Sequence, residues 1–134
     1  MNRWHRLGRG VVTAALAAAL LTGATACSSG GVEHLSANDF AHSIAADDTV
    51  VVDVRTPAEY AQAHIPNAIN IDVEGATFDS QIAGLDKSKH YALYCHSGRR
   101  SGIAADKMHD AGFTHVVDLK GGIQTWTGTV VSGS

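Results

Sequence analysis

Thr49-Val50-Val51-Val52-Asp53-Val54 is the stretch that decides the fold. Its residues are almost all β-branched, and its apolar side chains follow one another instead of alternating with polar ones. In a strand with one solvent-exposed face, apolar residues alternate with polar ones, whereas a strand covered on both faces has a nearly continuous apolar sequence. The stretch therefore predicts a central strand buried on both faces.

The segments around this strand alternate between strand and helix patterns. Ser36, with Asp39 three residues later, is typical of a helix start, and Pro57 suits the first turn of the next helix. Ser101 is expected to begin a helix that ends at Gly112. Further strands are expected at 32–35, 68–71, 91–94 and 116–117, and shorter helices at 77–84 and after 121–122. This order predicts an α/β fold with a central, mainly parallel sheet flanked by helices.

Residues 1–27 have the pattern of a secretory signal. They contain Arg3, Arg6 and Arg9 but no acidic residue, followed by an apolar run over 11–21. That run is shorter than the ~20 residues a membrane span needs. The stretch 23–27 (Gly-Ala-Thr-Ala-Cys) resembles the lipobox of bacterial lipoproteins, which implies cleavage before Cys27 and a lipid on its sulfur.

One departure from the lipobox leaves alternatives open. The lipobox usually has Leu where this chain has Ala24, so ordinary signal cleavage after Ala26 and a short uncleaved anchor helix are the competing readings. We expect a lipoprotein-type signal peptide at 1–26, a flexible tether at 27–33 and a folded domain at 34–130. The domain would then be exported and held by Cys27 on the extracytoplasmic side of a bacterial membrane.

Composition and charge narrow the function further. The chain has 134 residues, 45 % hydrophobic and 17 % charged, which is ordinary for one folded domain. Outside the leader, seven basic residues face 13 acidic ones, a formal charge of −6, so nucleic-acid binding is disfavoured. Cys27 and Cys95 are too few for a disulfide framework, although a single bridge between them is an alternative. The eight histidines show no metal-binding spacing.

Cys95 is the candidate nucleophile. It directly follows the predicted strand 91–94, and ligand sites in parallel sheets lie outside the carboxyl ends of the strands. The turn after it leads into a helix, so its backbone N–H groups and the helix N-terminus favour an anion. Two arginines, Arg99 and Arg100, add charge nearby, and together these effects favour the reactive thiolate.

The loop 95–101 (Cys-His-Ser-Gly-Arg-Arg-Ser) resembles the rhodanese pattern C-x-x-G-x-R-S/T. Two more segments agree with this family: 53–60 (DVRTPAEY) with 64–71 (HIPNAINI), and 119–126 (LKGGIQTW). The resemblance implies a rhodanese-like three-layer fold over the domain 34–130. It also implies a sulfurtransferase that moves sulfane sulfur from a donor such as thiosulfate to cyanide or a thiol, through a persulfide on Cys95.

The same resemblance implies a division of roles. The loop residues would hold the small anionic donor and the persulfide: His96, Ser97, Gly98, Arg99, Arg100 and Ser101. Asp53 and Arg55 would support the site as a structural pair. No metal or organic cofactor is required, and we expect a monomer. Arg100 is the fifth residue after Cys95, and this loop is one residue shorter than that of related phosphatases, which fits a single sulfur atom.

Three other functions compete with this interpretation. A non-catalytic persulfide carrier or protein-interaction module would use the same fold. A redox-sensing thiol would need a resolving cysteine, and only Cys27 is available. A phosphatase is opposed by the length of the loop.

Overall fold

The computed structural model describes residues 31–134. The predicted signal peptide, Cys27 and most of the predicted tether lie outside the described residues. In the described part, no helix combines the length and the apolar character needed to cross a membrane.

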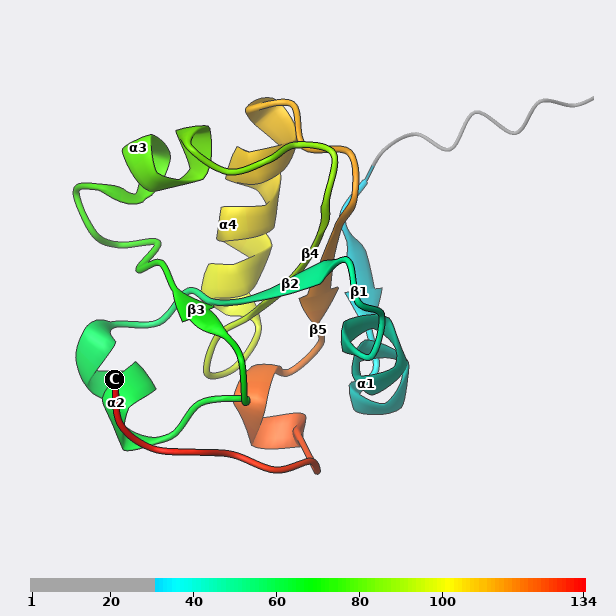
Figure 1. Cartoon of the computed structure of the whole chain (residues 1–134), viewed down its shortest axis with the longest axis vertical. Helices are drawn as coiled ribbons and strands as arrows, with labels where there is room; N and C mark the ends of the chain where they lie inside the picture. The colour runs from blue at the N-terminus through cyan, green and yellow to red at the C-terminus, as the bar shows by residue number, and fades with distance from the viewer. Residues whose placement is uncertain (1–30) are drawn as a thin grey trace, which may run out of the picture.

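A five-stranded, fully parallel sheet forms the centre of the domain (Figure 1). Its strands run in the order β1-β5-β4-β2-β3. They span β1 (Glu33–Leu35), β2 (Thr49–Asp53), β3 (Ile69–Asn70), β4 (His90–Tyr94) and β5 (Val116–Leu119). The stretch at 49–54 is thus an interior strand, paired with β4 on one side and β3 on the other, as its apolar run predicted.

Helices cover both faces of the sheet, which makes three layers (Figure 1). The helices span α1 (Ala37–Ile44), α2 (Pro57–Gln62), α3 (Phe78–Ala83) and α4 (Arg99–Asp110), followed by the 3-10 helix η1 (Gly122–Thr125). Alternate residues of β4 enter two cores: Tyr91 and Leu93 pack with α3 and α4, and Ala92 and Tyr94 pack with α1. The predicted α/β class and the flanked parallel sheet are confirmed.

The helix caps confirm part of the sequence prediction and correct one position. Ser36 caps α1 by accepting a hydrogen bond from the Asp39 amide, and Thr56 with Glu59 forms a full capping box on α2. We expected the long helix to begin at Ser101, which was wrong, since α4 begins at Arg99. Gly98 caps it with a left-handed φ of 98°, a conformation that glycine adopts without steric cost.

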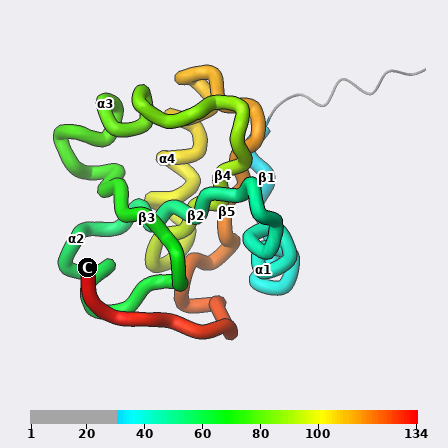
Figure 2. The backbone as a smooth tube through the Cα atoms, viewed as in Figure 1, coloured from blue at the N-terminus to red at the C-terminus, as the bar shows by residue number. Residues whose placement is uncertain are grey.

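The C-terminal tail folds back across α2. The backbones of His64 and Val131 exchange two hydrogen bonds of 2.8 and 2.9 Å, and the Gly133 amide donates to the Ala61 carbonyl. Figure 2 shows this last segment in red, ending beside α2. The ordered chain therefore continues past residue 130.

Candidate functional site

Cys95 directly follows β4, at the carboxyl ends of the strands of the sheet. Its side chain belongs to the core that α3 and α4 cover, and it is only 1 % exposed. In the structure it is a free thiol. The predicted nucleophile is therefore a buried sulfur at the carboxyl ends of the strands, where ligands bind in parallel sheets.

The Cys95 sulfur accepts hydrogen bonds from the turn that follows it. The Gly98 amide donates to Sγ at 3.0 Å, and the Ser101 hydroxyl donates at 3.4 Å. Burial raises the pKa of the Cys95 thiol, but hydrogen bonds from Ser101, Gly98 and Ser97 outweigh it, so the pKa lies below its usual value. The turn therefore stabilises the thiolate, which is the nucleophilic form.

Backbone amides of η1 donate hydrogen bonds to the carbonyls of this turn. The Ile123 amide donates to the Cys95 carbonyl at 2.8 Å, and the Gln124 amide donates to the His96 carbonyl at 3.3 Å. Gly122 has a φ of 66°, and a Cβ placed on it would lie 2.4 Å from the His96 carbonyl carbon. The glycine pair at 121–122 thus permits a close approach of two backbones that holds the loop in shape.

Arg100 does not present a free charge to the loop. Its guanidinium donates two hydrogen bonds to Glu59, to Oε2 at 2.8 Å and to Oε1 at 2.7 Å, and it lies 3.7 Å from Glu74. The pair lowers the pKa of Glu59 to about 2 and raises that of Arg100. Glu59 is a site residue that our sequence analysis missed as a functional group. Its place in the "E-Y" part of the family motif was the available signal.

The other predicted loop residues differ in exposure. His96, Ser97 and Arg99 are exposed, and Nε2 of His96 lies 2.9 Å from the Gln124 amide nitrogen. Ser101 is fully buried behind the sulfur. The structure thus brings Gly98 and Ser101 to the sulfur atom. The donor-binding roles of the exposed residues stay a prediction.

Asp53 and Arg55 form the structural pair that the sequence suggested. The Arg55 guanidinium donates to both carboxylate oxygens, the shortest contact being 2.6 Å, and both residues are buried. Arg55 also donates to the Ala63 carbonyl, and Asn70 donates to the Asp53 and Arg55 carbonyls. This network fixes the segment between β2 and α2 beside the cysteine loop.

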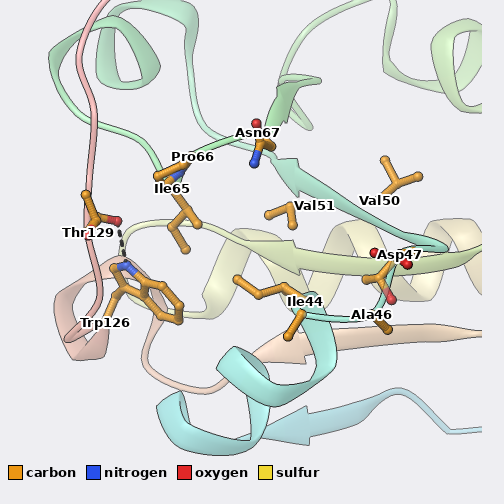
Figure 3. Close-up of a pocket in the computed structure, with 12 residues that line it drawn as sticks. Ile44, Ala46, Asp47, Val50, Val51, Ile65, Pro66, Asn67, Trp126 and Thr129 are labelled. Carbon is orange, nitrogen blue, oxygen red and sulfur yellow. Dashed lines mark hydrogen bonds between the residues drawn. The ribbon is translucent and has the colours of Figure 1, made fainter.

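The described residues line two cavities of similar size, and one of them borders the cysteine loop. That cavity measures about 560 Å³, and its lining includes His96, Arg55, Glu59 and Gln124. The second, of about 550 Å³, lies on the α1 side of the sheet between Ile44, Val51, Ile65 and Trp126 (Figure 3). Its lining includes no residue of the cysteine loop, so the first cavity, which His96 lines, is the candidate path to the sulfur.

Comparisons with known proteins point to one family. The profile of the Rhodanese-like domain matches residues 36–129. A sulfurtransferase of Allochromatium vinosum is 35 % identical over 80 residues, which cover 60 % of this chain and 73 % of that protein. The thiosulfate sulfurtransferase PspE of Escherichia coli is 37 % identical over 70 residues, 52 % of this chain and 67 % of that protein.

A third relative is longer than this chain. The putative sulfur carrier protein YrkF of Bacillus subtilis is 32 % identical over 98 residues, which cover 72 % of this chain but about half (52 %) of that protein. Among solved structures, a rhodanese-related protein of Thermoplasma volcanium matches with a TM-score of 0.66 at 32 % identity. The match covers 74 % of this chain and 97 % of that one.

Proposed function

Because the chain belongs to the rhodanese-like family, we propose that it is a sulfurtransferase that carries sulfane sulfur as a persulfide on Cys95. Its relatives at 32–37 % identity are named sulfurtransferases and a sulfur carrier. One observation carries the proposal. The only cysteine of the described residues 31–134 ends an interior parallel strand, and its sulfur accepts hydrogen bonds from Gly98 and Ser101.

The proposed reaction has two steps. The Cys95 thiolate attacks the outer sulfur of a donor such as thiosulfate, the S–S bond of the donor breaks, and sulfite leaves with the bonding electrons. Cyanide or a thiolate then attacks the outer sulfur of the persulfide, which releases thiocyanate or a new persulfide and restores the Cys95 thiolate. The loop N–H groups that hold the thiolate are suited to the persulfide anion as well.

The two arginines of the loop take different parts in this proposal. Glu59 neutralises Arg100, so Arg100 shapes the loop by joining α4 to α2. Arg99 is exposed, which leaves its charge available to attract an anionic donor toward the loop in an otherwise acidic domain. Thiosulfate specificity is part of the proposal and rests on the names of the relatives.

The test is thiosulfate:cyanide turnover by residues 28–134, beside the Cys95→Ser variant. Thiocyanate formation in the parent and none in the variant would support the enzyme and its nucleophile together. Thermal unfolding of the variant controls for its fold. A folded parent with a reduced Cys95 and no turnover would contradict an enzyme.

A persulfide carrier is the second candidate, favoured by the name of the Bacillus subtilis relative and by the burial of the sulfur. A carrier would hold one sulfur per molecule after exposure to donor, without releasing it to cyanide. Mass spectrometry separates the two, since a carrier retains an added mass of one sulfur atom where an enzyme loses it. Export and a lipid on Cys27 remain part of the proposal for the whole protein.

A further inference from the structure

The cavity beside the cysteine loop is much larger than thiosulfate or cyanide requires. Its volume of about 560 Å³ falls within the ~300–1,000 Å³ that is typical of sites for small organic molecules. Three parts of the chain form its walls: residues 55–63 around α2, His96 with residues 123–126 around η1, and Gly128 and Val130 of the C-terminal tail. The space next to the sulfur therefore has room for a substrate with an organic body.

The C-terminal tail is fixed in place as one wall of this cavity. Gly128 lies against the indole ring of Trp126, and a Cβ on this glycine would collide with the ring. The Trp126 Nε1 donates a hydrogen bond of 3.0 Å to the Thr129 carbonyl (Figure 3). The Val131 backbone exchanges two hydrogen bonds with the segment that follows α2. The chain is thus held on both sides of Val130, which lines the cavity.

The charged side chains in the lining already have partners. Arg55 is paired with the buried Asp53, and Glu59 accepts two hydrogen bonds from Arg100. The other side chains that line the space are polar or apolar: Gln62, Ala63, His96, Ile123, Gln124, Trp126 and Val130. A charged body would lose water here and meet no unpaired arginine, lysine or carboxylate among the described lining residues, which is costly. Amide groups of a neutral body can instead hydrogen-bond to the two glutamines.

We propose that this cavity binds the sulfur acceptor, a thiol whose body is uncharged and carries amide groups, and that Val130 of the tail helps to select it. A cysteine within a peptide chain is such a thiol, because its amino and carboxyl groups are in amide bonds. The acceptor thiolate attacks the outer sulfur of the Cys95 persulfide. The S–S bond breaks, its electrons return to the Cys95 sulfur, and the acceptor leaves as a persulfide. This acceptor class rests on the proposed function, because it is the second substrate of that reaction.

Two neighbouring valines of the tail provide a matched pair for the test. Val130 lines the cavity, whereas Val131 is not among its lining residues. Their exposed fractions are nearly equal, 45 % and 41 %, so a polar side chain is tolerable at either position. Successive side chains of an extended chain point to opposite sides. Val130→Lys therefore brings a positive charge to the cavity, and Val131→Lys adds the same charge outside it.

The test compares two acceptors of nearly the same shape, the neutral N-acetylcysteinamide and N-acetylcysteine, which carries a carboxylate. With thiosulfate as donor and the full chain as enzyme, kcat/KM is measured for each acceptor. Each value is divided by the rate at which the same thiol attacks an uncharged alkyl disulfide, which corrects for the reactivity of the thiol itself. The parent should prefer the neutral acceptor by at least about threefold. Val130→Lys should move this preference toward N-acetylcysteine by about three- to tenfold, and Val131→Lys should move it by less than about twofold.

Gln62→Lys is a second variant in case Val130→Lys does not fold. Gln62 is exposed and lines the opposite, α2 wall of the cavity, so the preference should move in the same direction. A parent without the preference, a preference unmoved by both substitutions, or an equal shift in Val131→Lys would overturn the proposal.

Two further measurements separate the remaining outcomes. A short uncharged peptide with a central cysteine should give a higher kcat/KM than N-acetylcysteinamide if the acceptor is a protein segment, and an equal one if it is a small thiol. Thiocyanate formation from cyanide reports the proposed function independently of the acceptor cavity. If it persists while the preference fails, only the acceptor assignment is wrong; if Cys95 never gains a sulfur atom, the proposed function fails with it.

Discussion

Replacing Glu59 with glutamine tests whether the pair between α2 and α4 stabilises the domain as the structure indicates. Glutamine removes the charge that Arg100 contacts through two hydrogen bonds of 2.7 and 2.8 Å. It keeps the length of the side chain and can still accept from the Thr56 amide, so the cap of α2 should survive. The variant therefore isolates the charge pair.

The expected loss of stability can be worked out from the pKa shift of the Glu59 carboxylate. The hydrogen bond from Arg100 is the main reason that the pKa of Glu59 falls from 4.5 to about 2. That fall corresponds to at most about 3.4 kcal/mol. Because 31 % of the Glu59 side chain is exposed, solvent screens the pair, and we expect a loss of about 1–2 kcal/mol.

The pH dependence gives the sharper assay. The folded state holds the pKa of Glu59 below its unfolded value, so its stabilisation is fully present above pH 4.5 and is lost as the pH falls through 2. Urea unfolding at pH 6 and pH 3 should show the difference between parent and Glu59→Gln shrinking by roughly half or more. A difference of equal size at both pH values would refute the reasoning.

Glu74→Gln is the matched control for this experiment. Glu74 contacts the same guanidinium at 3.7 Å, but its side chain is 61 % exposed. An exposed pair of this kind contributes little, so the variant should differ from the parent by less than about 0.5 kcal/mol at pH 6.

Four further predictions concern other parts of the chain. Gly102→Ala should stabilise the domain by about 0.5–1 kcal/mol in urea unfolding, because a Cβ there meets nothing within 4 Å inside α4. Gly122→Ala should instead destabilise it and reduce sulfur transfer, since the new Cβ would collide with the backbone of the cysteine loop; equal stability of the two variants would contradict this account. Arg55→Ala should cost about 3–5 kcal/mol in the same assay, since it leaves Asp53 charged and buried without its partner. Finally, radiolabelled palmitate fed to bacteria that express the full chain should label the parent protein and leave Cys27→Ser unlabelled; an unlabelled parent would favour ordinary signal cleavage.

The strands and caps were predictable because they depend on short-range patterns. A continuous apolar run identified β2, and Ser36 and Pro57 identified the starts of α1 and α2. The strand pattern at 91–94 placed Cys95 at the end of β4, where the structure has it. Each of these features depends on neighbouring residues, which a sequence displays directly.

The start of α4 and the partners of the loop were not predictable in the same way. Ser101 resembles an N-cap, but its hydroxyl turns to the sulfur, and Gly98 caps the helix without a side chain. The contact between Glu59 and Arg100 joins residues 41 positions apart, and spacing in the sequence does not reveal it. A charged residue within an apolar strand, such as Asp118, is a signal that sequence reading can use, although it does not identify the partner.

The parallel strands also determine which terminus of the chain is the better point for attaching it to a surface or to a fused domain. Every strand runs in the same direction, so the chain enters β1 at the amino ends of the strands (Figure 1). Cys95 directly follows β4 and therefore lies at the opposite, carboxyl ends. A bead, sensor surface or reporter domain joined ahead of residue 31 would attach at the end of the sheet opposite the cysteine loop. The same cargo joined after Ser134 would emerge beside α2, where the tail pairs with His64 close to the loop. Immobilisation through the N-terminal side is therefore the arrangement that keeps the reactive edge open to its partners.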